Sequence, residues 1–138
     1  MNRSITTVLA FCAVAVVAQP RPAEAHHSFA MYDPTRLVTL KGTIKSLLWS
    51  NPHVVIWLIR EPVTGEATQT WTLELSSPGY LARYGWSRTS LKPGDPVEMQ
   101  IFPLRSGDTG GSLRTVKILS TGQVLYSNAN QGQSSAQP

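Results

Sequence analysis

The sequence predicts an all-β domain with one short helix, folded as a small five-stranded OB-like Greek-key barrel. Charged residues make up only 14% of the chain, and the ten glycines and ten prolines indicate short elements with many turns rather than a helical bundle. The expected elements come in the order of three strands, one helix and two strands, which is the order of an OB-fold. A β-sandwich would need more strands at regular spacing and has no natural place for the helix.

Residues 1–25 have the pattern of a secretory signal peptide. An apolar run from Ile5 to Ala18 follows the basic Arg3 and ends near the small-x-small motif Ala23-Glu24-Ala25. The run is shorter than the roughly 20 apolar residues that cross a bilayer. The sequence therefore predicts a protein exported to the periplasm or outside the cell, with no membrane span after cleavage and with His26 as its first residue.

Cleavage after residue 25 leaves 113 of the 138 residues, which is enough for one small domain over 26–126. Because the only cysteine, Cys12, leaves with the signal, this domain contains no disulfide and no thiol ligand. Loss of Arg3, Arg21 and Glu24 lowers the formal charge from +4 to +3, and the remaining charges are spread along the chain. This distribution gives little support for a polyanion partner.

Two of the three strands before the helix, the first and the third, are predicted from apolar residues that alternate with polar ones. Val38 to Leu48 is the first, and Gly42 within it suggests a bulge or a sharp bend. His53 to Arg60 is apolar on both parities, which predicts a second strand covered on both faces, and Thr68 to Leu75 is the third. The side chains expected to share one face are Val38, Leu40, Ile44 and Leu48 in the first strand, and Trp71, Leu73 and Leu75 in the third.

The helix is predicted from its end signals. Ser77 can cap the N-terminus, Pro78 suits the first helical position, and Gly85 supplies the left-handed stop. Pro96–Phe102 and Leu113–Leu119 are the last two strands of the barrel. The remaining expectations are a lead-in whose Phe29, Met31 and Tyr32 cover one edge or end of the core, a short segment Val124–Tyr126, and a disordered polar tail over 127–138.

Trp49-Ser50-Asn51-Pro52-His53 links the first two strands, and Asn-Pro is a turn signal. The structural interpretation is that Trp49 closes the barrel end, Asn51 caps the turn and His53 begins the second strand. The functional interpretation is that this loop, one of two that OB-folds use for binding, presents Trp49, Asn51 and His53 to a small ligand or a periplasmic protein. The sequence therefore predicts a binding module at the barrel end.

An alternative function is metal binding at the expected new N-terminus. His26 would offer an α-amino nitrogen and an imidazole nitrogen that chelate Cu(II), and His53 or His27 would add a second imidazole. The α-amino group has an ordinary pKa near 8, so it loses its proton readily when a metal binds at neutral pH. This arrangement resembles the histidine brace of periplasmic copper carriers and copper oxygenases, although the resemblance covers His26 alone.

Other chemistries receive little support from the sequence. No serine lies in a Gly-x-Ser-x-Gly motif, the acids do not cluster, and the Gly-rich segment 107–111 lacks the lysine of a phosphate-binding loop. OB-folds often bind single-stranded nucleic acid, but the four tryptophans are placed for packing and an exported protein does not meet that substrate. The sequence thus predicts no nucleic-acid partner, favours a non-catalytic protein and identifies no catalytic residue.

Several motifs together resemble a family of small exported bacterial proteins known as domain of unknown function 6152. The matching segments are Ala25-His26-His27-Ser28-Phe29, Lys41-Gly42-Thr43-Ile44, Trp49-Ser50-Asn51-Pro52-His53, Ser77-Pro78-Gly79-Tyr80-Leu81 with Gly85-Trp86, and Leu91-Lys92-Pro93-Gly94-Asp95. They are spread over nearly the whole chain after the signal. The resemblance implies an exported single domain and assigns no activity to it.

Overall fold

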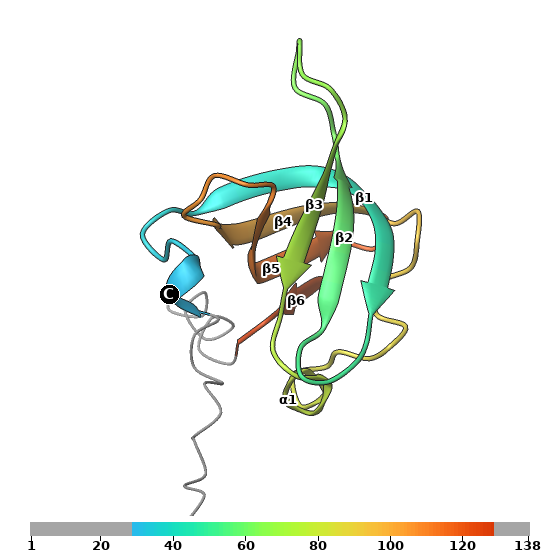
Figure 1. Cartoon of the computed structure of the whole chain (residues 1–138). Coiled ribbons are helices and arrows are strands. Elements are labelled where there is room, and N and C mark those ends of the chain that lie inside the picture. The colour runs from blue at the N-terminus through green and yellow to red at the C-terminus, as the bar shows by residue number, and fades with distance from the viewer. Residues whose placement is uncertain (1–28, 129–138) are drawn as a thin grey trace, which may run out of the picture.

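Five strands close into a β-barrel with one short helix, as the sequence predicted (Figure 1). The computed structural model describes residues 29–128. The elements are a 3-10 helix η1 (Phe29–Met31), β1 (Val38–Leu48), β2 (Val55–Arg60), β3 (Gln69–Glu74), α1 (Pro78–Ala82), β4 (Pro96–Pro103), β5 (Gly110–Ile118) and β6 (Val124–Tyr126). The expected order of three strands, a helix and two further barrel strands is confirmed.

A short parallel pairing closes the barrel. Four neighbouring pairs are antiparallel (β1 with β2, β1 with β4, β2 with β3 and β4 with β5), and β3 then pairs in parallel with β5 through Thr72–Glu74 and Gly110–Ser112. Gly111 permits the close approach of β5 to β4, because a Cβ there would lie 2.7 Å from the carbonyl oxygen of Phe102. β6 pairs with β5 outside the closed ring.

A bulge in β1 changes which side chains face the core. The register between β1 and β2 shifts between Ile44 and Ser46, so the alternation that begins with Leu40 is broken there. Leu47 consequently packs against the core, whereas Leu48, expected to face inward, is 46% exposed. The prediction for Leu48 was wrong because a strict two-residue period cannot anticipate the extra residue of a bulge.

Gly42 has a different role from the predicted one. It lies beside the backbone of β2, and a Cβ at this position would overlap the carbonyl oxygen of Ile59. The bulge itself begins two residues later, after Ile44. Gly42 is therefore required for close strand approach, which is the other usual reason for a glycine within a strand.

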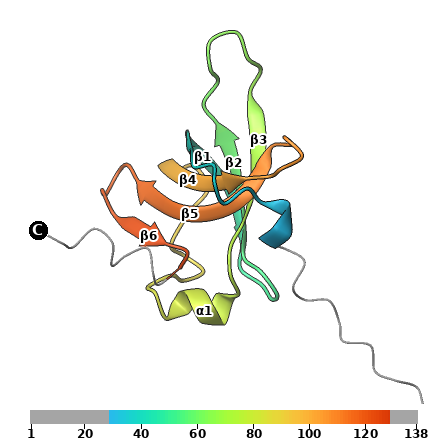
Figure 2. The ribbon, with the colours of Figure 1, turned by 90° about the vertical axis from the view of Figure 1, so that its left-hand side faces the viewer.

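The outer face of β2 is only partly covered, contrary to the prediction that both faces are covered. Ile56 and Leu58 are fully buried on the inner face, but Val55 and Trp57 are half-buried and Ile59 is 38% exposed. The helix lies below one end of the barrel and does not flank this face (Figures 1 and 2). The outer face of β2 therefore carries more apolar side chains than the described residues bury.

Helix α1 closes one end of the barrel (Figure 2). Ser77 caps its N-terminus by accepting a hydrogen bond from the Tyr80 amide at 3.4 Å, and Leu81 is fully buried in the core. Gly85, with φ of +84°, follows the last turn in the left-handed conformation that glycine adopts readily. Nearby, the buried indole of Trp86 donates to the Tyr126 carbonyl at 2.8 Å, which ties the segment after the helix to β6.

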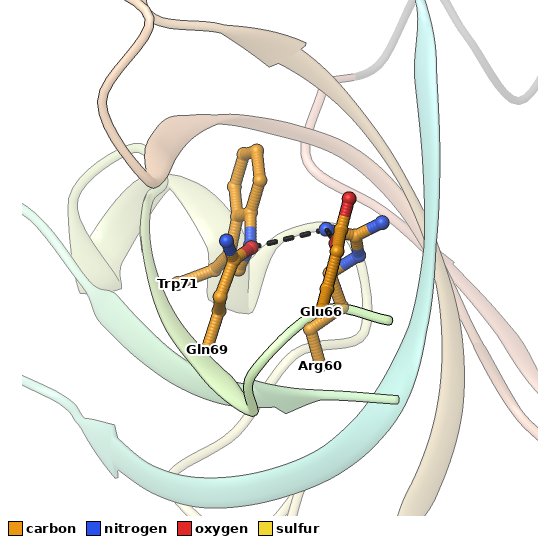
Figure 3. A network of polar contacts seen from close by, with 4 residues as sticks. All are labelled: Arg60, Glu66, Gln69 and Trp71. Carbon is orange, nitrogen blue, oxygen red and sulfur yellow. Dashed lines mark hydrogen bonds and ion pairs between the residues drawn. The ribbon is translucent and has the colours of Figure 1, made fainter. Parts of the chain in front are cut away.

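The β2–β3 hairpin projects from the other end of the barrel (Figure 1). Figure 3 shows its polar contacts, in which the amide oxygen of Gln69 accepts from Arg60 Nη1 at 3.0 Å and from Trp71 Nε1 at 3.3 Å. Arg60 Nη1 also lies 3.0 Å from a carboxylate oxygen of Glu66. Since Trp71 packs against the core, these contacts fix the base of the hairpin to the barrel.

The described residues include the first two residues of the segment 127–138, which was predicted to be a disordered tail. Ser127 is buried, its amide donates to the Arg114 carbonyl at 3.0 Å, and its hydroxyl donates to the Leu113 carbonyl. Residues 1–28 and 129–138 lie outside the described range. The first of these segments includes the predicted signal peptide, His26 and His27. Within 29–128, no helix has the length and apolar character needed to cross a membrane.

Candidate functional site: a Tyr32–Glu74–His53 chain beside a pocket

None of the three residues predicted to bind a ligand at the barrel end lines the pocket described below. Trp49 is half-buried and packs against the core, in agreement with its structural interpretation. Asn51 is exposed in the loop, where the Asn51–Pro52 peptide bond is cis. The side chain of His53 contacts the carboxylate of Glu74 and is 34% exposed.

Glu74 joins His53 to Tyr32. The Tyr32 hydroxyl donates to one carboxylate oxygen of Glu74 at 2.8 Å, and Nδ1 of His53 contacts the other oxygen. Because a carboxylate only accepts hydrogen bonds, Nδ1 carries the hydrogen of this contact and Nε2 of the neutral ring carries the lone pair. Glu74 is therefore held from two sides, with 28% of its side chain exposed.

The strand register explains why these residues meet. Val55 pairs with Glu74, and His53 lies two residues before Val55, so it has the same strand parity. Glu74 pairs on its other side with Ser112 of β5. Tyr32 arrives from the lead-in, which is fixed next to β4 because the Asp33 amide donates to the Pro103 carbonyl at 2.9 Å.

A pocket of about 330 Å³ lies next to this chain of contacts, beside the short β3–β5 pairing. The pocket wall is formed by the lead-in, the end of β3 and the residues after it, the adjoining parts of β4 and β5, and the two residues that follow β6. Its apolar wall includes Phe102, Leu75 and Leu113. Polar groups on the wall include Glu74 and the hydroxyls of Tyr32, Ser112 and Ser127.

Sequence reasoning missed Glu74 and assigned Tyr32 only a packing role. Tyr32 is buried, as expected for a residue that covers the core edge, whereas Met31 from the same prediction is 49% exposed. The available signal for Glu74 was an acid between the buried Leu73 and Leu75, at the end of a strand whose other outward residues are threonines. That signal carries no information about a partner 42 residues away.

Tyr32 gives the folded protein a specific response to alkaline pH. Burial, followed by the hydrogen bond to Glu74 and its negative charge, raises the pKa of Tyr32 well above its usual value near 10. Above pH 10 the unfolded chain therefore loses this proton before the folded chain does, and stability falls as pH rises.

We expect Tyr32→Phe to lower the free energy of unfolding at pH 7 by about 1–2 kcal/mol, because Glu74 loses a donor. Between pH 10 and 12, stability should fall less steeply in this variant than in the unmodified protein. Urea denaturation at a series of pH values measures both effects. Parallel curves for the two proteins above pH 10 would contradict the role assigned to the Tyr32 hydroxyl.

Within residues 29–128, no group of three His, Cys, Asp or Glu side chains is close enough to hold a metal ion. His53 and Glu74 form a pair, in which the carboxylate occupies one ring nitrogen of His53. His26 and His27, the other predicted metal ligands, are outside the described range. A site built from His53 and two further side chains of these types would therefore need at least one ligand from outside that range.

The comparison with protein families matches the chain to a family of unknown function (DUF6152) over residues 13–114. A search of curated proteins and a search of solved structures gave no match. The matched range covers most of the chain and includes β1–β4, His53 and Glu74. The chain belongs to this family of unknown function, DUF6152.

Proposed function

We propose that this protein is an exported binding module that holds a small organic ligand in the pocket beside Glu74. The pocket carries the proposal, because its volume of about 330 Å³ lies within the range of small-molecule sites. Its wall also combines an apolar surface with a few polar groups, which is the usual composition of such sites. Export is supported by the signal-peptide pattern of residues 1–25.

The proposed ligand site lies away from the loop at residues 49–53. Trp49 is engaged with the core and Asn51 is not part of the pocket wall. His53 keeps an indirect role, since it holds one oxygen of Glu74 while Glu74 lines the pocket. The residues expected to contact the ligand are thus Glu74, Tyr32, Phe102 and Ser112.

Filling the pocket tests this function. Ser112→Phe places a large side chain on the pocket wall, and Thr115→Phe, at a half-buried position of the same strand outside the pocket, is the matched control. Saturation-transfer NMR with benzylamine, benzyl alcohol and benzoate measures binding to each protein. We expect at least one probe to bind the unmodified protein and the Thr115→Phe variant but not Ser112→Phe. Absence of binding by all three, or equal binding to both variants, would refute the proposal.

Copper binding is a second candidate function, and the orientation of His53 favours it. Metal-bound histidines usually donate their other ring N–H to a carboxylate, which fixes the ring and its tautomer. The contact of His53 Nδ1 with Glu74 has this form and leaves Nε2 as the nitrogen able to bind a metal. Copper(II) favours nitrogen ligands in a tetragonal arrangement.

The position of Tyr32 allows the predicted N-terminus to take part. Tyr32 and His53 contact the same carboxylate, and His26 precedes Tyr32 by only six residues. Six residues span at most about 20 Å. If cleavage occurs after Ala25, the α-amino and imidazole nitrogens of His26 are thereby tethered near His53, with His27 as the alternative second imidazole.

Electron paramagnetic resonance with Cu(II) tests this second candidate. The protein that begins at His26 should bind Cu(II) more tightly than a version with one extra residue before His26, and the two spectra should differ. His53→Ala should change the spectrum of the first protein if His53 is a ligand. An unchanged spectrum would exclude His53, and identical affinities and spectra for the two N-termini would exclude a site built on the α-amino group.

A further inference from the structure

Two of the four hydroxyl groups on the pocket wall already donate hydrogen bonds within the protein. The Tyr32 hydroxyl donates to Glu74 at 2.8 Å, and the Ser127 hydroxyl donates to the Leu113 carbonyl. Both oxygens can still accept hydrogen bonds, and the Glu74 carboxylate can accept more than the two bonds it receives. Glu74 and these two hydroxyl oxygens therefore offer acceptors to a ligand that donates hydrogen bonds.

The charge of the pocket wall favours a positively charged ligand. Glu74 is the one charged side chain among the described residues of the pocket wall. The neighbouring acid Asp33 is not part of the wall, and it accepts two hydrogen bonds from Thr35 and lies 4.0 Å from a guanidinium nitrogen of Arg105. A ligand in the pocket thus meets the charge of a single carboxylate.

Glu74 is also held in place before any ligand arrives. Its two oxygens are fixed by Tyr32 and His53, which come from different parts of the chain. A positioned acceptor loses little conformational freedom when a ligand binds, and hydrogen bonds between charged groups are the stronger kind. An ammonium group provides three donors and a positive charge, which suits a carboxylate that is already held in position.

From these observations we infer that the ligand is an organic amine, whose ammonium group contacts Glu74 and whose apolar body lies against Phe102 and Leu113. The inference rests on the proposed function and assigns the chemical class of its ligand. Both parts of the amine find a counterpart, because the same pocket wall carries the carboxylate and the apolar side chains.

Calorimetric titration of the unmodified protein with three probes of similar size tests this assignment. Benzylamine carries a positive charge, benzyl alcohol is neutral and benzoate is negative. We expect benzylamine to bind at least tenfold more tightly than either of the others. Equal affinities, or tighter binding of benzyl alcohol or benzoate in the pocket, would overturn the inference and leave the proposed binding function standing. If none of the probes binds, both fail.

Two variants distinguish the effect of the Glu74 charge on amine binding from the effect of the protein's net charge. Glu74→Gln keeps the shape of the side chain and one acceptor oxygen but removes the charge, and it should abolish the tenfold preference for benzylamine while benzyl alcohol binding is retained. Glu98→Gln removes the same charge from β4, where Glu98 pairs with Lys41 at 3.4 Å, away from the pocket wall. It should leave the preference unchanged. Retention of the preference in Glu74→Gln would overturn the inference.

Discussion

Replacing Gly42 by alanine should destabilise the protein by about 3 kcal/mol, at the upper end of the usual cost of overpacking. The added Cβ would overlap the carbonyl oxygen of Ile59, and it would lie 3.0 Å from the Cα of Arg60. Both are backbone atoms of β2, which is paired with β1 on one side and β3 on the other, so they cannot move aside as a flexible side chain would. The clash is relieved only when β1 and β2 separate.

Gly79→Ala is the matched control for this prediction. Gly79 lies in α1, its φ is not positive, and no atom lies within 4 Å of an added Cβ. Alanine favours helix over glycine by up to about 1 kcal/mol, so this variant should be unchanged or slightly stabilised. Urea denaturation of both variants provides the comparison. A loss below 1 kcal/mol in Gly42→Ala would show that β1 and β2 do not approach as closely as described.

Glu74→Ala should lower the free energy of unfolding by about 1–3 kcal/mol, because the buried Tyr32 hydroxyl loses its acceptor. If this contact is the cause, Tyr32→Phe should cost much less in the Glu74→Ala background than in the unmodified protein. The double-mutant cycle then gives a coupling energy of about 1–2 kcal/mol. The His53–Glu74 pair is more exposed, and its coupling should stay below about 1 kcal/mol.

The surface pair Lys41–Glu98 is the reference for this cycle. It spans the neighbouring strands β1 and β4 at 3.4 Å, with more than a third of each side chain exposed, so Glu98→Ala should change stability by less than about 1 kcal/mol. Additive effects of Tyr32→Phe and Glu74→Ala would mean that the two side chains act independently. The hydrogen bond between Tyr32 and Glu74 would then contribute nothing measurable to stability.

The parts of the fold that were predicted correctly depend on local sequence. Alternation indicated β3 and β4, and the cap signals Ser77, Pro78 and Gly85 indicated the helix and its ends. Two predictions of burial, those for Leu48 and Ile59, were wrong for structural reasons that alternation does not reveal. Leu48 faces outward because a bulge adds one residue to the alternation, and Ile59 is exposed because no element within residues 29–128 flanks the outer face of β2.

The candidate site was predicted only in part, because its contacts are distant in sequence. His53 was singled out from its position after Asn51-Pro52, but its partner Glu74 depends on the register between β2 and β3. Tyr32 reaches Glu74 across 42 residues, and the pocket forms beside the parallel pairing of β3 with β5. Alternation within one strand does not determine which strands close a barrel.

Two-dimensional amide NMR during a titration with benzylamine shows whether a small ligand occupies the pocket beside Glu74. The largest shifts should cluster at residues of the pocket wall, namely Glu74–Ser76, Phe102, Ser112–Leu113 and Ser127. Amides of the exposed β2–β3 hairpin, at Val63 and Glu66, should not move. Shifts scattered over the surface, or centred on the loop at residues 49–52, would contradict binding in this pocket.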